Sequence, residues 1–317
     1  MKRYASIDIG TNTVRLLIAD GDYLSSKRPI LKSTTITRLG GGFGPSNNLD
    51  LGSMERTAKT LKEFGRLLEN NNVKTVLAAA TCVVRQAKNR DDFLRMVRDE
   101  CGIQVEVIDA EKEARLTLKG VLSTLKGTAP PILVFDIGGG STEYILASNG
   151  EPVVTSLDLG VVYLTESFLK SDPPASHELA SLENRIAAVL EPCKHNYLSR
   201  LSLPLTVVGC GGTVTTLAAM DKGMENYDPD QINNCLLRGA TIGAIYRKLA
   251  GLPLEQRKKI AGLEPGRADV IIPGCAIVLK TLEAFRAPEL LVSDAGLLEG
   301  LLLNLMEKEQ ERFLLKN

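Results

Sequence analysis

Short apolar runs and helical repeats alternate along the whole chain. Two strand-like runs, Tyr4–Ile9 and Val14–Ala19, flank Gly10 and predict a β-hairpin with its turn at residues 10–13. Further on, the pattern predicts helices over Met54–Asn70, Asp91–Cys101 and Glu111–Lys126, and strands over Lys74–Ala80 and Gln104–Ile108. Residues 127–131, which read Gly-Thr-Ala-Pro-Pro, are typical of a linker.

The opening pattern returns after this linker. The strand-like runs Ile132–Ile137 and Thr142–Ala147 flank three consecutive glycines. When the two segments are aligned without gaps, three pairs of positions coincide: Asp8 with Asp136, Thr13 with Ser141, and Arg15 with Glu143. A repeat this long is typical of two copies of one domain rather than of a solenoid.

Strands and helices interleave through the rest of the chain, which predicts the α/β class. Helices are expected over Leu179–Glu191, Thr213–Met220, Thr241–Leu249, Ala268–Ala284 and Leu297–Leu315, and strands over Leu205–Val208 and Leu290–Ser293. We expect a first domain over 1–123, joined by the C-terminal helix 297–317, and a second domain over 124–296, with a cleft between them.

Composition narrows the function classes. Lys and Arg together number 38, and so do Asp and Glu, so the chain lacks the basic excess of a nucleic-acid-binding protein. The six cysteines have no metal-ligand spacing, and no apolar run approaches the ~18 residues that span a bilayer. His177 and His195 have no partner at ligand spacing and are expected at the surface, which argues against a Ser-His-Asp hydrolase. A soluble, cytoplasmic protein without membrane or nucleic-acid partners is expected.

The two glycine turns carry the first candidate chemistry. In Asp-Ile-Gly-x-x-Ser/Thr, glycine brings bare N–H groups up to phosphate oxygens, and Thr13 or Ser141 can add a hydroxyl donor. The preceding carboxylate, Asp8 or Asp136, can hold Mg²⁺ directly or through water. A plain β-turn would explain one such loop, but two equivalent loops favour phosphate binding.

A third glycine loop, Gly211-Gly212-Thr213, lies between a strand and a helix. A helix N-terminus attracts anions through its unpaired N–H groups, so this loop also suits phosphate. The alternative is that its glycines serve only close strand–helix packing.

Two charged segments have both a functional and a structural interpretation. Glu113 begins a helix and could act as a general base, although glutamates in a first helical turn also complement the helix dipole. Arg85, with Lys88 and Arg90, follows a strand and could contact phosphates, or lie in a solvated loop. The run 257–259, Arg-Lys-Lys, is more typical of a solvated helix face.

Several of these stretches, taken together, resemble a known family. They are Ser6–Leu16, Arg85–Asn89, Glu113–Leu116, Asp136–Glu143, Gly211–Thr213, Arg267–Asp269, Pro273-Gly274 and Ser293-Asp294-x-Gly296. Their order resembles the actin, sugar-kinase and heat-shock-chaperone ATPase superfamily. Within it the chain is similar to the exopolyphosphatase/guanosine pentaphosphate phosphatase (Ppx/GppA) family, in its short two-domain form. The resemblance implies two related ribonuclease H-like domains.

The resemblance also implies roles for individual residues. Glu113 would be the general base, and Asp136 would organise Mg²⁺ or another divalent cation and the attacking water, with Glu143 and Asp8 as further metal ligands. The implied phosphate-binding residues are Asn12, Thr13, Arg85, Gly138, Gly139, Gly140, Ser141, Gly211, Gly212, Thr213 and Arg267. The chain departs from the family pattern at Cys82, Val83 and Leu298.

The expected activity is the Mg²⁺-dependent release of terminal phosphate from inorganic polyphosphate. The alternative substrate is guanosine pentaphosphate (pppGpp), cleaved at its 5′ end by the same centre. More distant alternatives are an actin-like ATPase scaffold and a kinase of a small hydroxyl substrate. A homodimer is compatible with the sequence.

Overall fold

The computed structural model describes residues 2–44, 46–148, 150–198 and 205–315 of this 317-residue chain. The chain divides into two compact units. The first unit joins Met1–Ser123 to Ala295–Asn317, and the second is Thr124–Asp294.

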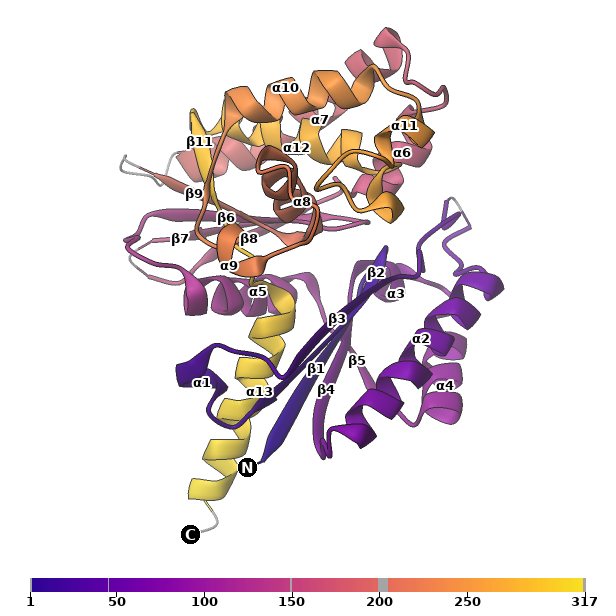
Figure 1. The fold of residues 1–317 in the computed structure, drawn as a ribbon, viewed down its shortest axis with the longest axis vertical. Coiled ribbons are helices and arrows are strands. Elements are labelled where there is room, and N and C mark those ends of the chain that lie inside the picture. The colour runs from indigo at the N-terminus through magenta and orange to yellow at the C-terminus, as the bar shows by residue number, and fades with distance from the viewer. Residues whose placement is uncertain (1, 45, 149, 199–204, 316–317) are drawn as a thin grey trace. The chain divides into compact units, whose positions relative to one another are not determined.

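A five-stranded sheet with helices on both faces forms the first unit (Figure 1). Its strand order is β3 (Leu31–Ile36), β2 (Thr13–Asp20), β1 (Arg3–Ile9), β4 (Thr75–Ala80) and β5 (Val105–Val107). The first three strands along the chain are antiparallel, and β4 and β5 run parallel to β1. The helices are α1 (Tyr23–Ser26), α2 (Leu51–Asn70), α3 (Cys82–Gln86), α4 (Arg90–Cys101), α5 (Ala110–Thr124) and α13 (Leu297–Leu314).

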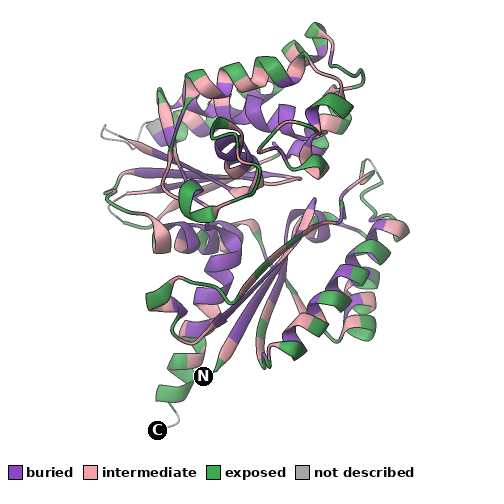
Figure 2. Ribbon diagram, in the orientation of Figure 1, coloured by how far each residue is buried: buried purple, intermediate pink, exposed green. Residues whose placement is uncertain are grey.

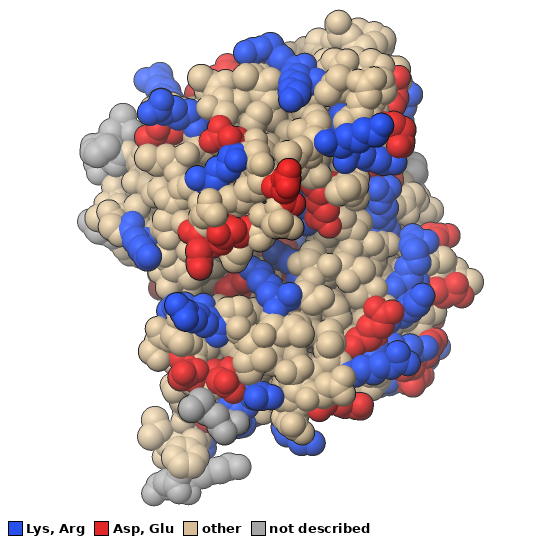
Figure 3. Space-filling model, viewed as in Figure 1, with Lys and Arg blue, Asp and Glu red and all other residues tan. Residues whose placement is uncertain are grey.

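Helix α2 shows why this layer forms. Asp50 caps it by accepting a hydrogen bond from the Ser53 N–H at 2.9 Å, and Leu61 and Phe64 lie on its buried face. On its solvent side, basic and acidic side chains are interspersed over α2 and the neighbouring α4 (Figure 3). The apolar face therefore packs on the sheet while the charged face stays in water.

Helix α13 covers the opposite face of this sheet, although it is distant in sequence. Tyr4 and Leu17 from the sheet pack against Leu298, Leu302 and Met306 of α13. The Ser6 hydroxyl also donates to the Leu298 carbonyl oxygen at 2.7 Å. Leu298, one of the departures from the family pattern, is fully buried and serves this core.

The second unit repeats the strand arrangement of the first. Its sheet has the order β10 (Leu236–Arg238), β11 (Glu289–Val292), β9 (Thr206–Cys210), β6 (Ile132–Ile137), β7 (Thr142–Ala147) and β8 (Val153–Leu157). Strands β6, β7 and β8 are antiparallel, whereas β9 and β11 continue parallel to β6. This is the pattern of β1 to β5, with the antiparallel β10 added at the edge.

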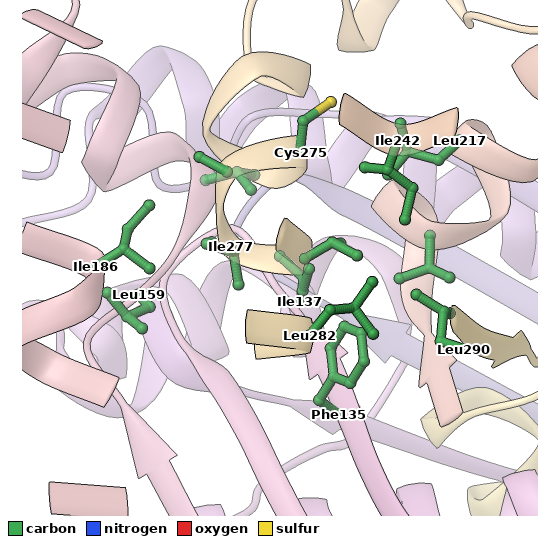
Figure 4. Packing of buried hydrophobic residues seen from close by; sticks show 14 of the residues in the cluster. Phe135, Ile137, Leu159, Ile186, Leu217, Ile242, Cys275, Ile277, Leu282 and Leu290 are labelled. Atoms are coloured by element: carbon green, nitrogen blue, oxygen red, sulfur yellow. The ribbon is translucent and has the colours of Figure 1, made fainter. Parts of the chain in front are cut away.

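Helices cover one face of the second sheet and bury a large apolar core (Figures 1 and 2). They are α6 (Val161–Phe168), α7 (Ser176–Leu198), α8 (Gly211–Asp221), α10 (Gly239–Ala250) and α12 (Ile271–Ala284), with the short α9 (Pro229–Ile232) and α11 (Leu254–Arg257). In Figure 4, Phe135 of β6 lies beside Leu282 of α12, and Ile137 lies near Ile277 of the same helix. Among the described helices, none is both long and apolar enough to cross a membrane.

The apolar pattern predicted most elements correctly, and the differences are informative. The two hairpins, the helix–strand alternation and the surface positions of His177 and His195 are confirmed. Strands β3, β8 and β10 were not predicted, because they are short or half-exposed edge strands that lack a continuous apolar run. Residues 82–86 form a helix rather than a loop, α7 is longer than predicted, and the α12 helix begins at Ile271. The predicted end of the last helix, residues 316–317, lies outside the described residues.

Candidate active site

The turn between β1 and β2 is closed by a hydrogen bond from the Gly10 N–H to the Thr13 carbonyl oxygen, at 2.9 Å. The carbonyl oxygen of the buried Asn12 accepts hydrogen bonds from the N–H groups of Thr37 and Arg38, at 3.0 and 2.9 Å. The segment that follows β3 therefore holds this turn in place through two backbone hydrogen bonds. Thr13 lies at the first position of β2 and is partly exposed.

Asp8, two residues before this turn, lies opposite Arg15 in the β1–β2 register. Arg15 donates to one oxygen of Asp8, Oδ2, from Nη2 at 2.6 Å and from Nε at 2.9 Å. The other oxygen, Oδ1, is buried and has no hydrogen-bond partner among the described residues. A buried acceptor without a partner is unfavourable. A divalent cation, or a water molecule bound to one, would therefore supply the partner that Asp8 Oδ1 lacks.

The turn between β6 and β7 is built in the same way. The Gly138 N–H donates to the Ser141 carbonyl oxygen at 2.9 Å, matching the bond that closes the first turn. Asp136 lies opposite Glu143 in the register, so an acid takes the place that Arg15 has in the first unit. Glu143 is buried, and its Oε1 accepts hydrogen bonds from the hydroxyls of Ser141 at 2.7 Å and Ser156 at 2.8 Å.

Packing against α6 orients the peptide groups of this second turn. The N–H groups of Val161 and Val162 donate to the carbonyl oxygens of Gly138 and Gly139, at 3.1 and 3.0 Å. Because a trans peptide places its N–H opposite its C=O, the N–H groups of Gly139 and Gly140 point away from α6. Neither of these two N–H groups has a protein acceptor in the part of the chain that the structure describes. They are suited to binding an anion.

Gly160 makes this arrangement possible and was not predicted from the sequence. A Cβ on Gly160 would lie 2.2 Å from the Gly140 carbonyl carbon and 2.3 Å from the Gly139 oxygen. Only glycine lets the start of α6 approach the turn so closely. The available signal was a glycine directly before a helical run, which is common in sequences and does not by itself indicate a ligand site.

The third loop lies beside Asp136. Strand β9 is parallel to β6 and pairs Cys210 with Asp136, so α8 begins next to this carboxylate. Gly211 has a left-handed backbone, with φ +81°, and a Cβ there would lie 2.3 Å from Asp136 Oδ1. A Cβ on Gly212 would lie 2.2 Å from Arg267 Nη1, so the Arg267 guanidinium lies directly over Gly212. The second unit therefore gathers Asp136, the Gly-Gly pair and Arg267.

Thr213 fits the packing interpretation of this loop. Its side chain is buried, and a Cβ on Gly274 of α12 would lie 2.5 Å from the Thr213 methyl carbon Cγ2. The hydroxyl-bearing side chain thus packs against α12, while its backbone N–H belongs to the first turn of α8.

Glu113 and Arg85 come together in the first unit. Asp109 precedes α5 and accepts the Lys112 N–H through Oδ1 at 2.7 Å, which fixes the first turn that carries Glu113. Arg85, on α3, donates from Nη1 to Glu113 Oε2 at 3.0 Å and to the Ile108 carbonyl oxygen at 2.8 Å. Glu113 is buried, and its ion pair with Arg85 is a contact that the helix-dipole interpretation does not include. The solvated-loop alternative for Arg85 is wrong.

The other basic candidates differ in how far they are buried. Lys88 and Arg90 are exposed. Arg257 was predicted to lie on a solvated helix face, but it is 4% exposed, so that prediction is wrong. The sequence run did not indicate this burial, because the partners of Arg257, Asp172 and the Ala268 carbonyl oxygen, lie outside the run.

No group of three or more His, Cys, Asp or Glu side chains within the described ranges has the spacing of a metal cluster. Magnesium is commonly held by one or two carboxylates together with substrate phosphates. In the first unit the unsatisfied Asp8 oxygen fits such a ligand, and in the second unit so do the carboxylates of Asp136 and Glu143, which lie opposite each other in the β6–β7 register.

Two sheets with the same strand plan, each opening on a glycine turn, define an α/β protein of the actin-like ATPase superfamily with two ribonuclease H-like units. Residues 17–309 match the Ppx/GppA phosphatase family, and the chain belongs to this family.

Individual relatives agree with this assignment. The chain is 34% identical to exopolyphosphatase 2 of Mycobacterium tuberculosis, over 96% of this chain and 99% of that protein. It is 29% identical to a guanosine-5′-triphosphate,3′-diphosphate pyrophosphatase of Photobacterium profundum, over 96% of this chain and 59% of that protein. The crystal structure of the Aquifex aeolicus member of the Ppx/GppA family is similar, with a TM-score of 0.77 and 37% identity over 98% of both chains.

Proposed function

We propose that this phosphatase is an exopolyphosphatase that releases terminal phosphate from inorganic polyphosphate in the presence of Mg²⁺. The observation that carries the proposal is the turn at 138–141, where α6 holds the carbonyl groups of Gly138 and Gly139 and leaves the next two N–H groups facing away from α6. Such a turn binds a phosphate through backbone donors, without any base or sugar recognition.

In this mechanism the chain's own groups bind the phosphates and activate water. The N–H groups of Gly139 and Gly140 and the first turn of α8 hold the terminal phosphoryl group, whose oxygens gain charge in the transition state. Glu113 orients a water molecule and takes its proton as the water oxygen attacks phosphorus in line. The bond from phosphorus to the bridging oxygen breaks, and the shortened chain leaves with that oxygen.

Arg85 holds Glu113 in place and contacts the phosphate chain. A guanidinium has five N–H donors, so one arginine can bind both a carboxylate and a phosphate. In the second unit, Arg267 adds a positive charge over Gly212, at the third loop.

Asp8, Asp136 and Glu143 would hold the divalent cation. When bound, Mg²⁺ supplies positive charge that neutralises the phosphoryl oxygens. The buried, unpartnered Asp8 Oδ1 supports the assignment of Asp8.

The choice of substrate is supported by the identity to the relatives. The chain is 34% identical to the mycobacterial exopolyphosphatase 2 and 29% identical to the Photobacterium guanosine-nucleotide pyrophosphatase. Cleavage of pppGpp at its 5′ end by the same centre is the second candidate, favoured by that relative's name. Membership of a phosphatase family favours both over an ATPase scaffold or a kinase.

The decisive experiment measures phosphate release from polyphosphate and from pppGpp, with Mg²⁺, by the wild-type protein and by Glu113→Ala and Glu113→Gln. We expect both variants to lose about 10²–10⁴-fold in kcat with either substrate, the usual contribution of a general base. Glu111→Ala is the matched control, because Glu111 lies on the same helix, is exposed and pairs with Arg115 at 3.1 Å. Full activity of Glu113→Ala would refute the mechanism, and faster release from pppGpp would reverse the choice of substrate.

A further inference from the structure

Arg257 is a buried cation that none of the roles above uses. It ends the short helix α11, and its side chain is 5% exposed. Its Nη2 donates to Asp172 Oδ1 at 2.7 Å, and its Nη1 donates to the Ala268 carbonyl oxygen at 3.1 Å. Burying an arginine is unfavourable unless it is paired and hydrogen-bonded. A residue needed only to fill this space would be apolar, so these two bonds point to a specific task.

The first bond ties Arg257 to a rigid anchor. Asp172 also accepts the Leu254 N–H, at 3.0 Å to Oδ1 and 2.9 Å to Oδ2. The loop that carries Asp172 is held by the buried Glu178, which accepts the Ser171 hydroxyl at 2.5 Å and the Ala175 N–H at 2.8 Å. Arg257 is therefore held from a loop that is itself fixed.

The second bond reaches the phosphate-binding side of this unit. Ala268 follows Arg267, the residue whose guanidinium lies over Gly212. The Arg267 N–H donates to the Glu264 carbonyl oxygen at 2.8 Å, and the Val270 N–H donates to the Arg267 carbonyl oxygen at 3.1 Å. By binding the Ala268 carbonyl oxygen, Arg257 fixes the Ala268–Asp269 peptide, one residue beyond Arg267.

The segment between these two arginines lies along α8. A Cβ on Gly262 would lie 2.5 Å from the Ala219 carbonyl oxygen near the end of α8, and Arg267 lies over Gly212 at its start. With a rise of 1.5 Å per residue, these two contacts are about 10 Å apart along the helix. Arg257 closes this segment by joining its beginning to its end.

We propose that Arg257 is a positioning residue for phosphate binding, which sets the Arg267 guanidinium over the third loop by holding the Ala268 carbonyl oxygen. The inference rests on the proposed function, because it assigns Arg267 to phosphate. Arginine suits this task because its planar fork reaches Asp172 and the carbonyl oxygen together, whereas lysine has a single ammonium group.

The test is a double-mutant cycle with Arg257→Lys, Arg267→Ala and the double variant. It is carried out in a Glu113→Gln background, in which turnover is suppressed, and calorimetry gives the Kd for polyphosphate of defined length. We expect each single change to raise the Kd about ten-fold, the typical effect of one charge-assisted hydrogen bond. The double variant should bind no more weakly than Arg267→Ala alone, because Arg257 acts through Arg267.

The same variants in the otherwise wild-type enzyme should raise KM more than they lower kcat. Lys259→Ala, at an exposed position two residues further on, is the matched control and should change neither constant. If Arg257→Lys does not fold, Asp172→Asn tests the Arg257–Asp172 ion pair from its half-exposed partner. We expect Asp172→Asn to raise the Kd a few-fold.

The proposal would be overturned if the fold-changes in Kd of the two single variants multiplied in the double variant. An unchanged Kd in both Arg257→Lys and Asp172→Asn would also overturn it. Because the cycle measures binding, its outcome is independent of catalysis. Absent phosphate release by the wild-type enzyme would instead count against the proposed function.

Discussion

Arg15 lies across the first hairpin from Asp8 and donates two hydrogen bonds to a single oxygen of that carboxylate. In the repeated hairpin of the second unit, Glu143 takes the place of Arg15 and lies across from Asp136. The two turns therefore share a backbone and differ in charge. The first carboxylate is neutralised by its neighbour, whereas the second belongs to an acidic pair.

This difference predicts unequal metal dependence. Asp136→Asn should raise the Mg²⁺ concentration for half-maximal activity about ten-fold, because it removes half of an acidic pair. Asp8→Asn should raise it less, since Arg15 already offsets the Asp8 charge. A Mg²⁺ titration of phosphate release measures both, and chelation by EDTA should abolish release. A larger effect of Asp8→Asn would contradict this assignment.

Arg85 should be needed for its geometry as well as its charge. Arg85→Gln removes the bonds to Glu113 and to the Ile108 carbonyl oxygen, and we expect kcat/KM to fall about ten- to hundred-fold. Arg85→Lys keeps the charge but has one donor centre, so it should restore only part of the activity. Arg95→Gln, exposed on α4, is the control. Equal activity of the lysine variant and the wild type would show that charge alone is sufficient.

Gly160 offers a test of the second turn through stability. In Gly160→Ala the new methyl group meets backbone atoms of Gly139 and Gly140, which cannot move independently of the turn. We expect thermal unfolding to show that the free energy of unfolding falls by about 1–3 kcal/mol, and we expect phosphate binding to weaken. Gly243→Ala, inside α10, brings the methyl only within 3.5 Å of Arg247 Nη1 and should instead stabilise by about 0.5–1 kcal/mol. A tolerated alanine at 160 would mean that the turn is not rigid.

The Glu178 carboxylate, which holds the loop that carries Asp172, should make the stability of the fold depend on pH. Hydrogen bonds from the Ser171 hydroxyl and then the Ala175 N–H lower the pKa of Glu178 from 4.5 to about 2. A carboxyl whose pKa is lower in the folded state stabilises the fold above pH 4.5, and that contribution is lost as the pH falls from 4.5 towards 2. Melting temperatures of the wild type should therefore fall more steeply over this range than those of Glu178→Gln. Parallel curves would exclude Glu178 as the source.

Most of the fold could be predicted from the apolar pattern, because buried strands and amphipathic helices leave regular signals. The repeat of Asp8–Ile9–Gly10 at residues 136–138 correctly predicted two turns of the same construction. Edge strands such as β3 were missed, since none of the β3 residues is buried and most of its side chains are polar. Helix α13 itself was predicted, but its contacts with Tyr4, Ser6 and Leu17 leave no local signal, because these partners lie almost three hundred residues away.

The candidate site was predictable where a motif is local and unpredictable where contacts are long-range. The three glycine loops stand out in the sequence, whereas the role of Glu113 was implied by the family resemblance and not by its spacing. The pairing of Arg85 with Glu113 depends on the arrangement of α3 and α5, and the role of Gly160 depends on how α6 approaches the turn. Arg257 was misjudged because the sequence run Arg-Lys-Lys does not show which member points inward.

The position of α13 also affects how the chain folds as it is synthesised. Tyr4 and Leu17 are synthesised before the second unit, but Leu298 and Leu302, which cover them, follow only after the whole second unit has been made. One apolar face of the first sheet thus stays open during that interval, when exposed apolar surface favours aggregation. The second unit, whose residues are contiguous, can complete its own core first. We therefore expect the nascent first unit to depend on chaperones until α13 closes it.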